Sequence, residues 1–187
     1  GAWLPFGEVD ADLAEAQAKE AAKLGDGMTG ALAERLRAVF AEAPGIFNAL
    51  RAPEAWAVHA AWADKWKEAY DPVVWARVAA GRDVTPEAQA AGRRGRARLA
   101  AAFESAWQQY DYLVLPATPC VAPTKAECTQ ATRDRIFKIT TPVSVAGLPV
   151  LTVPVMLPGG FSTGLQIVAP RVDSPAFGEV LRMMKWM

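Results

Sequence analysis

The side chains that could carry acid–base or nucleophilic chemistry are few in this sequence. There is one histidine, His59, and the serines stand singly, at Ser105, Ser144, Ser162 and Ser174. A serine nucleophile activated by histidine needs the two side chains within hydrogen-bond reach. No serine lies within helical reach of His59, so only serines distant in the sequence could pair with it. We interpret His59 as a packed or partly buried side chain.

A metal site is not indicated either. His59 has no neighbouring ligand, and Cys120 and Cys128 have a spacing that fits no zinc pattern. The two cysteines favour free thiols in a cytoplasmic protein, with a local disulfide as the alternative. We therefore expect no metal ligand and no cofactor.

Two further motifs have structural interpretations. The glycine-rich run Pro158–Gly164 is followed by neither a lysine nor a helix, so it predicts a hairpin turn rather than a phosphate loop. A group of arginines lies on a predicted helix without an interleaved aromatic platform, and we interpret it as a solvated face: Arg93, Arg94, Arg96 and Arg98.

Composition excludes two classes of partner. The formal net charge is zero, so the chain has no overall field that would attract nucleic acid. The longest apolar run, Val143–Val155, is interrupted by glycine and proline and is too short to span a bilayer. We expect neither nucleic acid nor a membrane as a partner.

Apolar periodicity and capping residues divide the chain into a helical part and a strand-containing part. Helices are predicted over residues 11–24, 30–43, 53–70, 72–80 and 86–109, with Pro44-Gly45 ending the second. Short strands are predicted over Tyr112–Leu115, Val150–Val155 and Gly164–Ala169, the last two forming a hairpin. A loop over 117–132 and a closing helix over 175–185 complete the prediction. The order favours a single α+β domain over 1–187.

Aromatic residues mark the faces of two of these helices. His59, Trp62, Trp66 and Tyr70 fall at three- and four-residue steps and predict one stripe on the third helix. The longest helix has a buried face that we assign to Leu99, Phe103, Trp107 and Tyr110. Gly92 and Gly95 lie inside that helix and disfavour it somewhat.

Three segments, in order along the chain, carry a resemblance to a known family. Tyr110–Pro119 reads YDYLVLPATP, Thr141–Pro154 reads TPVSVAGLPVLTVP, and Gly164–Val168 reads GLQIV. Together they resemble the amidase-signature family of hydrolases. The resemblance is strongest over 71–187, whereas residues 1–70 share only a helical texture.

The resemblance implies the C-terminal slice of a large mixed sheet wrapped by helices. Members cleave a C–N amide bond with a Ser–cis-Ser–Lys triad and a Gly/Ser-rich oxyanion loop. Neither the adjacent serines nor that loop is present in this chain, so we assign no catalytic residue to it. The resemblance implies that the chain forms one wall of the substrate funnel.

The candidate substrate-binding residues follow from the same resemblance: Phe137, Ile139, Thr140, Thr141 and Gln166. Core packing is an equal alternative for the two threonine hydroxyls. Ser144 stands where the family frequently has asparagine. Phe137 stands where members that bind a substrate ammonium commonly have aspartate, so we expect a neutral, partly apolar amide.

The resemblance also implies partners, and it leaves alternatives. The leading hypothesis joins this chain to a missing N-terminal amidase half, with a homodimer through an exposed sheet edge as a further candidate. A second hypothesis is a non-enzymatic binding or assembly domain that uses Trp56, Trp62 and Trp66 as its partner surface. A third, which we disfavour, is a free-standing hydrolase that uses Ser144 or Ser162.

Overall fold

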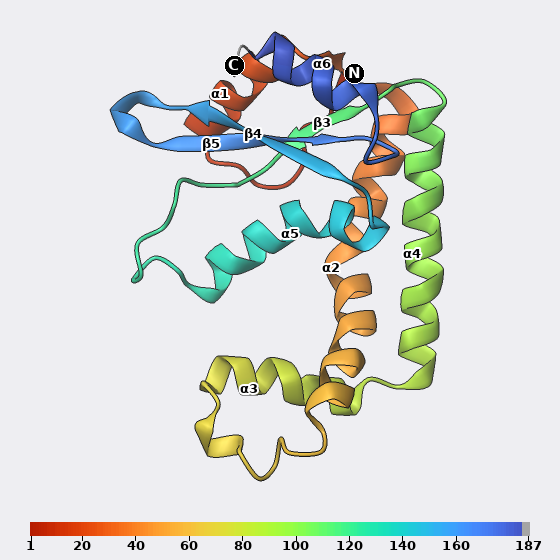
Figure 1. Ribbon diagram of the computed structural model, residues 1–187, viewed down its shortest axis with the longest axis vertical. Coiled ribbons are helices and arrows are strands. Elements are labelled where there is room, and N and C mark those ends of the chain that lie inside the picture. The colour runs from red at the N-terminus through yellow and green to blue at the C-terminus, as the bar shows by residue number, and fades with distance from the viewer. Residues whose placement is uncertain (185–187) are drawn as a thin grey trace.

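A single mixed sheet joins the two ends of the chain. The computed structural model describes residues 1–184, and its strands lie in the order β2-β1-β3-β5-β4 (Figure 1). Both neighbours of β1 run parallel to it, whereas β3, β5 and β4 pair antiparallel. The strands are β1 Ala2–Trp3, β2 Asp26–Gly27, β3 Leu113–Pro116, β4 Val150–Met156 and β5 Ser162–Val168.

Helices cover both faces of this sheet, and alternation along the strands assigns each residue to one side. In β3, Leu113 and Leu115 pack against α2, α4 and α5, while Val114 packs on the other side with α1 and α6 (Figure 1). The sequence prediction of an α+β fold is confirmed. The helices are α1 Ala11–Ala21, α2 Gly30–His59, α3 Pro72–Ala79, α4 Pro86–Trp107, α5 Gln130–Ala146 and α6 Pro175–Met183.

The long helix α2 corrects the predicted break at Pro44-Gly45. It runs unbroken through Pro44 and Pro53. A proline inside a helix costs about 3 kcal/mol because it removes a hydrogen bond and clashes with the preceding turn. Burial of Phe40 and Ile46 in the same core cluster as residues of α4 offsets this cost.

Close contact between α2 and α4 explains the glycines inside α4. A Cβ atom added to Gly95 would lie 2.7 Å from Cγ1 of Ile46, and one added to Gly92 would lie 3.1 Å from Cβ of Ala49. The glycines therefore let the two helices approach each other. The predicted buried face is confirmed for Leu99 and Phe103, and Trp107 is partly buried against the same cluster.

The aromatic stripe expected after residue 53 does not form on one helix. The helix ends at His59, and the chain continues in turns and a short 3₁₀ segment, Lys67–Ala69. Trp62 and Trp66 are 43% and 54% exposed. His59 is partly buried, and its Nδ1 lies 2.7 Å from the hydroxyl of Tyr70. The predicted helix over 53–70 therefore stops at His59, although isolated helical bonds such as that from the Ala63 amide to the His59 carbonyl continue beyond it.

The region after β3 contains a helix that the sequence did not predict. The loop expected over 117–132 ends at Thr129, whose hydroxyl accepts a hydrogen bond from the Thr132 amide at 3.2 Å and caps α5. The helix ends at Gly147, which has a φ of 72° in the left-handed region that favours glycine. The β-branched residues and the internal Pro142 of this segment have low helix propensity, so local patterns in the sequence indicate no helix. Burial of Ile139 and Val143 stabilises the helix.

The remaining predictions agree with the structure apart from small shifts. The hairpin of β4 and β5 is confirmed, and so is β3 as a buried strand. The closing helix ends at Met183, and its predicted end at Lys185 lies outside the described residues. Strands β1 and β2 were not predicted because each has only two residues. Within residues 1–184, no helix has both the length and the apolarity needed to cross a membrane.

Candidate functional site

Two hollows flank α5. The larger, a groove of about 1290 Å³, is lined by residues of α2, α3, the start of α4 and one face of α5. The smaller, about 250 Å³, lies between the loop after β3 and the β4–β5 hairpin. Ile136 lines both hollows. The helix that the sequence did not predict is therefore the wall between them.

Two of the candidate substrate-binding residues line the larger groove. Phe137 packs edge-on against Phe47 of α2, with ring centroids 5.2 Å apart and an interplanar angle of 83°. Thr140 also lines the groove, and its hydroxyl donates to the carbonyl oxygen of Ile136 at 3.1 Å. That bond uses the hydroxyl hydrogen and leaves acceptor lone pairs at the groove surface.

The other three candidates lie in the interior. Ile139 is fully buried, and the buried Thr141 hydroxyl donates to the carbonyl oxygen of Phe137. Gln166, at 6% exposure, donates from Nε2 to the Pro116 carbonyl at 2.6 Å and towards the Ile139 carbonyl at 3.4 Å. These contacts connect the end of β3 to α5. The structure thus brings Phe137 and Thr140 together and separates them from the buried set.

Ser144, which stands where the family frequently has asparagine, faces solvent. Ser144 is exposed, and its hydroxyl donates to the Thr140 carbonyl at 3.1 Å. It therefore completes a turn of α5 rather than linking that helix to another element.

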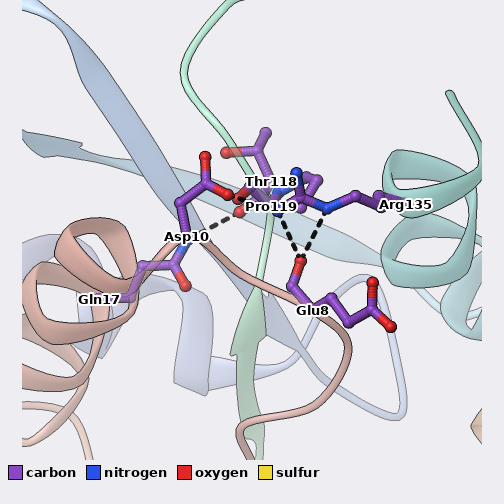
Figure 2. Close-up of polar contacts among 6 residues, drawn as sticks. All are labelled: Glu8, Asp10, Gln17, Thr118, Pro119 and Arg135. Atoms are coloured by element: carbon purple, nitrogen blue, oxygen red, sulfur yellow. Dashed lines mark hydrogen bonds and ion pairs between the residues drawn. The ribbon is translucent and has the colours of Figure 1, made fainter. Parts of the chain in front are cut away.

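An arginine on α5 fixes the first half of that helix (Figure 2). Arg135 donates from Nη2 to Oδ1 of Asp10 at 2.6 Å, to the Glu8 carbonyl at 3.0 Å and to the Pro119 carbonyl at 3.2 Å. The Asp10 amide also donates to the Pro119 carbonyl at 2.9 Å. The hydrogen bond to Asp10 raises the pKa of Arg135 above its usual range. The N-terminal segment, the loop after β3 and α5 are joined at this guanidinium.

Gln17 fixes the neighbouring loop in a similar way. This buried side chain of α1 donates from Nε2 to the Thr118 carbonyl at 3.0 Å and to the Thr163 hydroxyl at 2.7 Å. The hydroxyls of Thr118 and Thr163 lie 3.0 Å apart. Contacts from Gln17 and Arg135 therefore fix the start of the loop beside the smaller hollow.

The cysteines are both free thiols. Cys120 lines the smaller hollow, and burial raises the pKa of its thiol, an effect that Arg135 opposes. A raised pKa keeps the thiol protonated, which weakens it as a nucleophile. The prediction of free thiols agrees with the structure.

The hydrogen bonds that serine hydroxyls make in the described residues are local, and none of them reaches a base. The hydroxyls of Ser105 and Ser144 donate to helix carbonyls, and that of Ser174 caps α6. Within residues 1–184, no hydrogen bond joins a serine to a lysine or histidine, and no cluster of histidine, cysteine and carboxylate side chains could hold a metal ion. The arrangement can hold a ligand and shape a pocket.

Sequence reasoning missed the contribution of α2 and α3 to the larger groove. Phe47 and Arg51 of α2 and Arg77 of α3 line it opposite α5. Because the predicted break at Pro44 separated Phe47 and Arg51 from their helix, no periodic signal placed them together. The continuous helix is what brings them to one face.

Comparisons with known proteins identify the fold. A family model described as Amidase matches residues 47–176. The chain is similar to a structure reported with a vestigial protein complex and the origins of an s-triazine catabolic enzyme, with a TM-score of 0.79 and 20% identity. It is also similar to 6-aminohexanoate cyclic dimer hydrolase, with 0.74 and 19%, and to a bacterial aryl acylamidase of the amidase-signature enzymes, with 0.72 and 16%.

The extent of these matches is one-sided. They cover 98%, 99% and 98% of this chain but 42%, 45% and 44% of the respective structures. The chain therefore spans less than half the length of the proteins whose fold it shares. Among curated proteins, no sequence matches it.

Proposed function

Because the chain belongs to the amidase family, we propose that it is the substrate-contacting C-terminal part of an enzyme that hydrolyses a C–N amide bond. The observation that supports this most is the coverage: 98% of the chain aligns with 42% of a similar structure. In this proposal a second chain or domain supplies the triad. Water and the amide give a carboxylic acid and an amine, and this chain forms one wall of the substrate funnel.

The residues of the larger groove have distinct parts in this proposal. Phe137 and Phe47 offer apolar ring surface to the substrate, and Thr140 offers hydroxyl lone pairs. The buried residues on the other side of α5 position it: Gln166, Ile139 and Thr141. Their burial and hydrogen bonds support this role. The predicted site is thereby divided into residues that touch the substrate and residues that position them.

The contacts of α5 support the proposal that it acts as a preorganised wall. Arg135 joins it to the N-terminal segment, and Gln166 joins it to the sheet. A site held by packing and hydrogen bonds loses less conformational freedom when a ligand binds, so more of the interaction energy goes into affinity.

Reconstitution tests the proposed function. The chain is co-expressed with an amidase N-terminal half that carries the lysine and the serine loop, and the pair is assayed on a series of aryl and alkyl amides. We expect hydrolysis by the pair and none by either part alone. A complex that forms and has no amidase activity would contradict the proposal.

A non-enzymatic assembly domain is the second candidate function. Exposed aromatic side chains after α2, Trp62 and Trp66, favour it, because large exposed apolar groups mark protein contacts when they gather. Replacing both by serine distinguishes the two functions. If the double substitution abolished binding to a partner protein and left the amidase activity of the reconstituted pair unchanged, the assembly function would be favoured.

A further inference from the structure

One side chain of the larger groove is left without a partner. Arg51 of α2 is partly buried, and its Nε atom is buried without a hydrogen-bond acceptor among the described residues 1–184. Its guanidinium carbon lies 5.6 Å from the ring centroid of Phe47. A buried donor that makes no hydrogen bond is destabilising, which makes such groups rare in folded proteins.

Another arginine in the same chain shows what a purely structural stacking contact looks like here. Arg82 lies over the ring of Trp56 at 4.3 Å, and its Nη2 also donates to Oδ1 of Asp64 at 2.9 Å. Arg82 thus has both a ring and a carboxylate. Arg51 has the ring and lines the groove, but within residues 1–184 no carboxylate lies within 4.0 Å of its guanidinium nitrogens.

The charges around the groove favour an anion at that position. Three arginines line it, Arg51, Arg77 and Arg133, against two aspartates, Asp83 and Asp134. Asp134 already accepts a hydrogen bond from Gln130 Nε2 at 2.7 Å. Among residues 1–184, none of the three arginines forms an ion pair within 4.0 Å. The first turn of α4 also reaches the groove, and a helix N-terminus carries partial positive charge.

We propose that this groove is a carboxylate-binding subsite, in which the Arg51 guanidinium receives an anionic group and Phe47 and Phe137 hold the apolar body that carries it. The planar guanidinium donates two parallel hydrogen bonds to a carboxylate, a geometry that no other side chain offers. This inference rests on the proposed function, and it names the substrate class as an amide with a carboxylate on an apolar segment. It departs from the neutral substrate that the sequence alone predicted.

A matched pair of probes tests the subsite directly on the 187-residue chain. Calorimetric titration compares 4-phenylbutyrate with 4-phenylbutyramide, which share a body and differ in charge. We expect the carboxylate to bind about tenfold more tightly, as charge-assisted hydrogen bonds are roughly twice as strong as neutral ones. Arg51→Met keeps the apolar stem and should remove that preference, with the amide affinity changed less than about twofold.

The control is Arg94→Met, which removes an exposed arginine of α4 outside the groove. It should leave both affinities unchanged. Equal binding of the two probes to the unaltered chain would overturn the subsite, and so would an equal loss in the Arg94→Met control. Arg51→Lys keeps the charge without the planar fork and should keep less than half of the preference, which covers the case in which Arg51→Met fails to fold.

The failure of this inference can be told apart from the failure of the proposed function. Binding of the probes requires no catalytic half. Carboxylate preference without hydrolysis in the reconstituted pair would preserve the subsite and overturn the amidase proposal. Hydrolysis of neutral and carboxylate-bearing amides at equal rates would preserve the amidase proposal and overturn the subsite.

Discussion

Arg135 of α5 and Asp10, 125 residues apart in the sequence, form an ion pair at 2.6 Å. The aspartate precedes the first turn of α1, and the arginine also donates to two backbone carbonyls. The pair therefore links the beginning of the chain to the wall between the two hollows (Figure 2).

Replacing Arg135 with methionine should loosen that link. The Glu8 and Pro119 carbonyls would each lose a donor, and we expect a loss of about 1–2 kcal/mol in unfolding free energy, kept small because the pair is partly exposed. Thermal melting measures this. Arg171→Met is the control, since Arg171 pairs only locally with Asp173 at the surface. Equal effects of the two substitutions would contradict the linking role.

Gly81 lies against the backbone of α2 at Ala52, and its replacement should lower the free energy of unfolding. A Cβ atom at this position would lie 1.9 Å from the carbonyl oxygen of Ala52, which cannot move aside as a side chain would. We expect Gly81→Ala to reduce the unfolding free energy by about 2–3 kcal/mol in chemical denaturation. At Gly45 of α2 nothing lies within 4 Å, so Gly45→Ala should stabilise by roughly 0.5–1 kcal/mol. Destabilisation of equal size at both sites would contradict the packing described.

Thr140 and Gln166 should respond differently to substitution. Gln166→Leu removes the donor to the Pro116 and Ile139 carbonyls in the interior, and we expect a loss of about 1–3 kcal/mol in stability. Thr140→Val changes the groove surface at nearly constant shape. It should alter the substrate preference of the reconstituted enzyme with little effect on melting temperature. A shift in melting temperature as large as that of Gln166→Leu would show that Thr140 is a packing residue.

The thiol of Cys120 should lose its proton at a higher pH than a free cysteine, because its pKa is raised. Burial raises its pKa, so the folded state holds the proton more tightly than the unfolded state. Stability from this group is present below the unfolded thiol pKa, about 8.5, and is lost as pH rises towards the folded value. Alkylation of a Cys128→Ser variant by iodoacetamide measures the folded pKa. A midpoint at or below that of a free cysteine would contradict the burial of this thiol.

The outer edge of β4 should promote self-association of the isolated chain. Among the described strands, β4 pairs only with β5, and Val150 and Met156 are 40% and 64% exposed. We expect light scattering to report association that grows with concentration. Lysine at both positions should reduce it. Lysine at Val172, which is 82% exposed outside the sheet, is the control. A chain that stays monomeric at every concentration would contradict the open edge.

Local sequence patterns predicted the elements in which the pattern of apolar residues matches the pattern of burial in the folded chain. The Gly-rich turn between β4 and β5 and the buried face of α4 were read correctly, because alternation and helical spacing report burial directly. Local patterns did not predict that α2 continues through Pro44, nor that α5 exists. Both depend on contacts with distant segments, in which tertiary packing outweighs intrinsic propensity.

The candidate site shows the same limit. The resemblance supplied Phe137, Thr140 and Gln166, and it could not separate groove from interior, because that depends on how α5 turns against the sheet. Arg51 carried no signal at all. Its unpaired Nε atom is visible only once the helices are in place.

We propose that this chain, which has an amidase fold, depends on a second chain or domain for its catalytic residues, and an amide-hydrolysis assay of the purified 187 residues tests this most directly. We expect no turnover above the uncatalysed rate, because the sequence has neither the adjacent serines nor the Gly/Ser-rich oxyanion loop that would lower the barrier. The same assay on a variant with Ser105, Ser144, Ser162 and Ser174 replaced by alanine identifies contaminating activity. Turnover by the unaltered chain that is abolished by Ser144→Ala or Ser162→Ala alone would contradict the account.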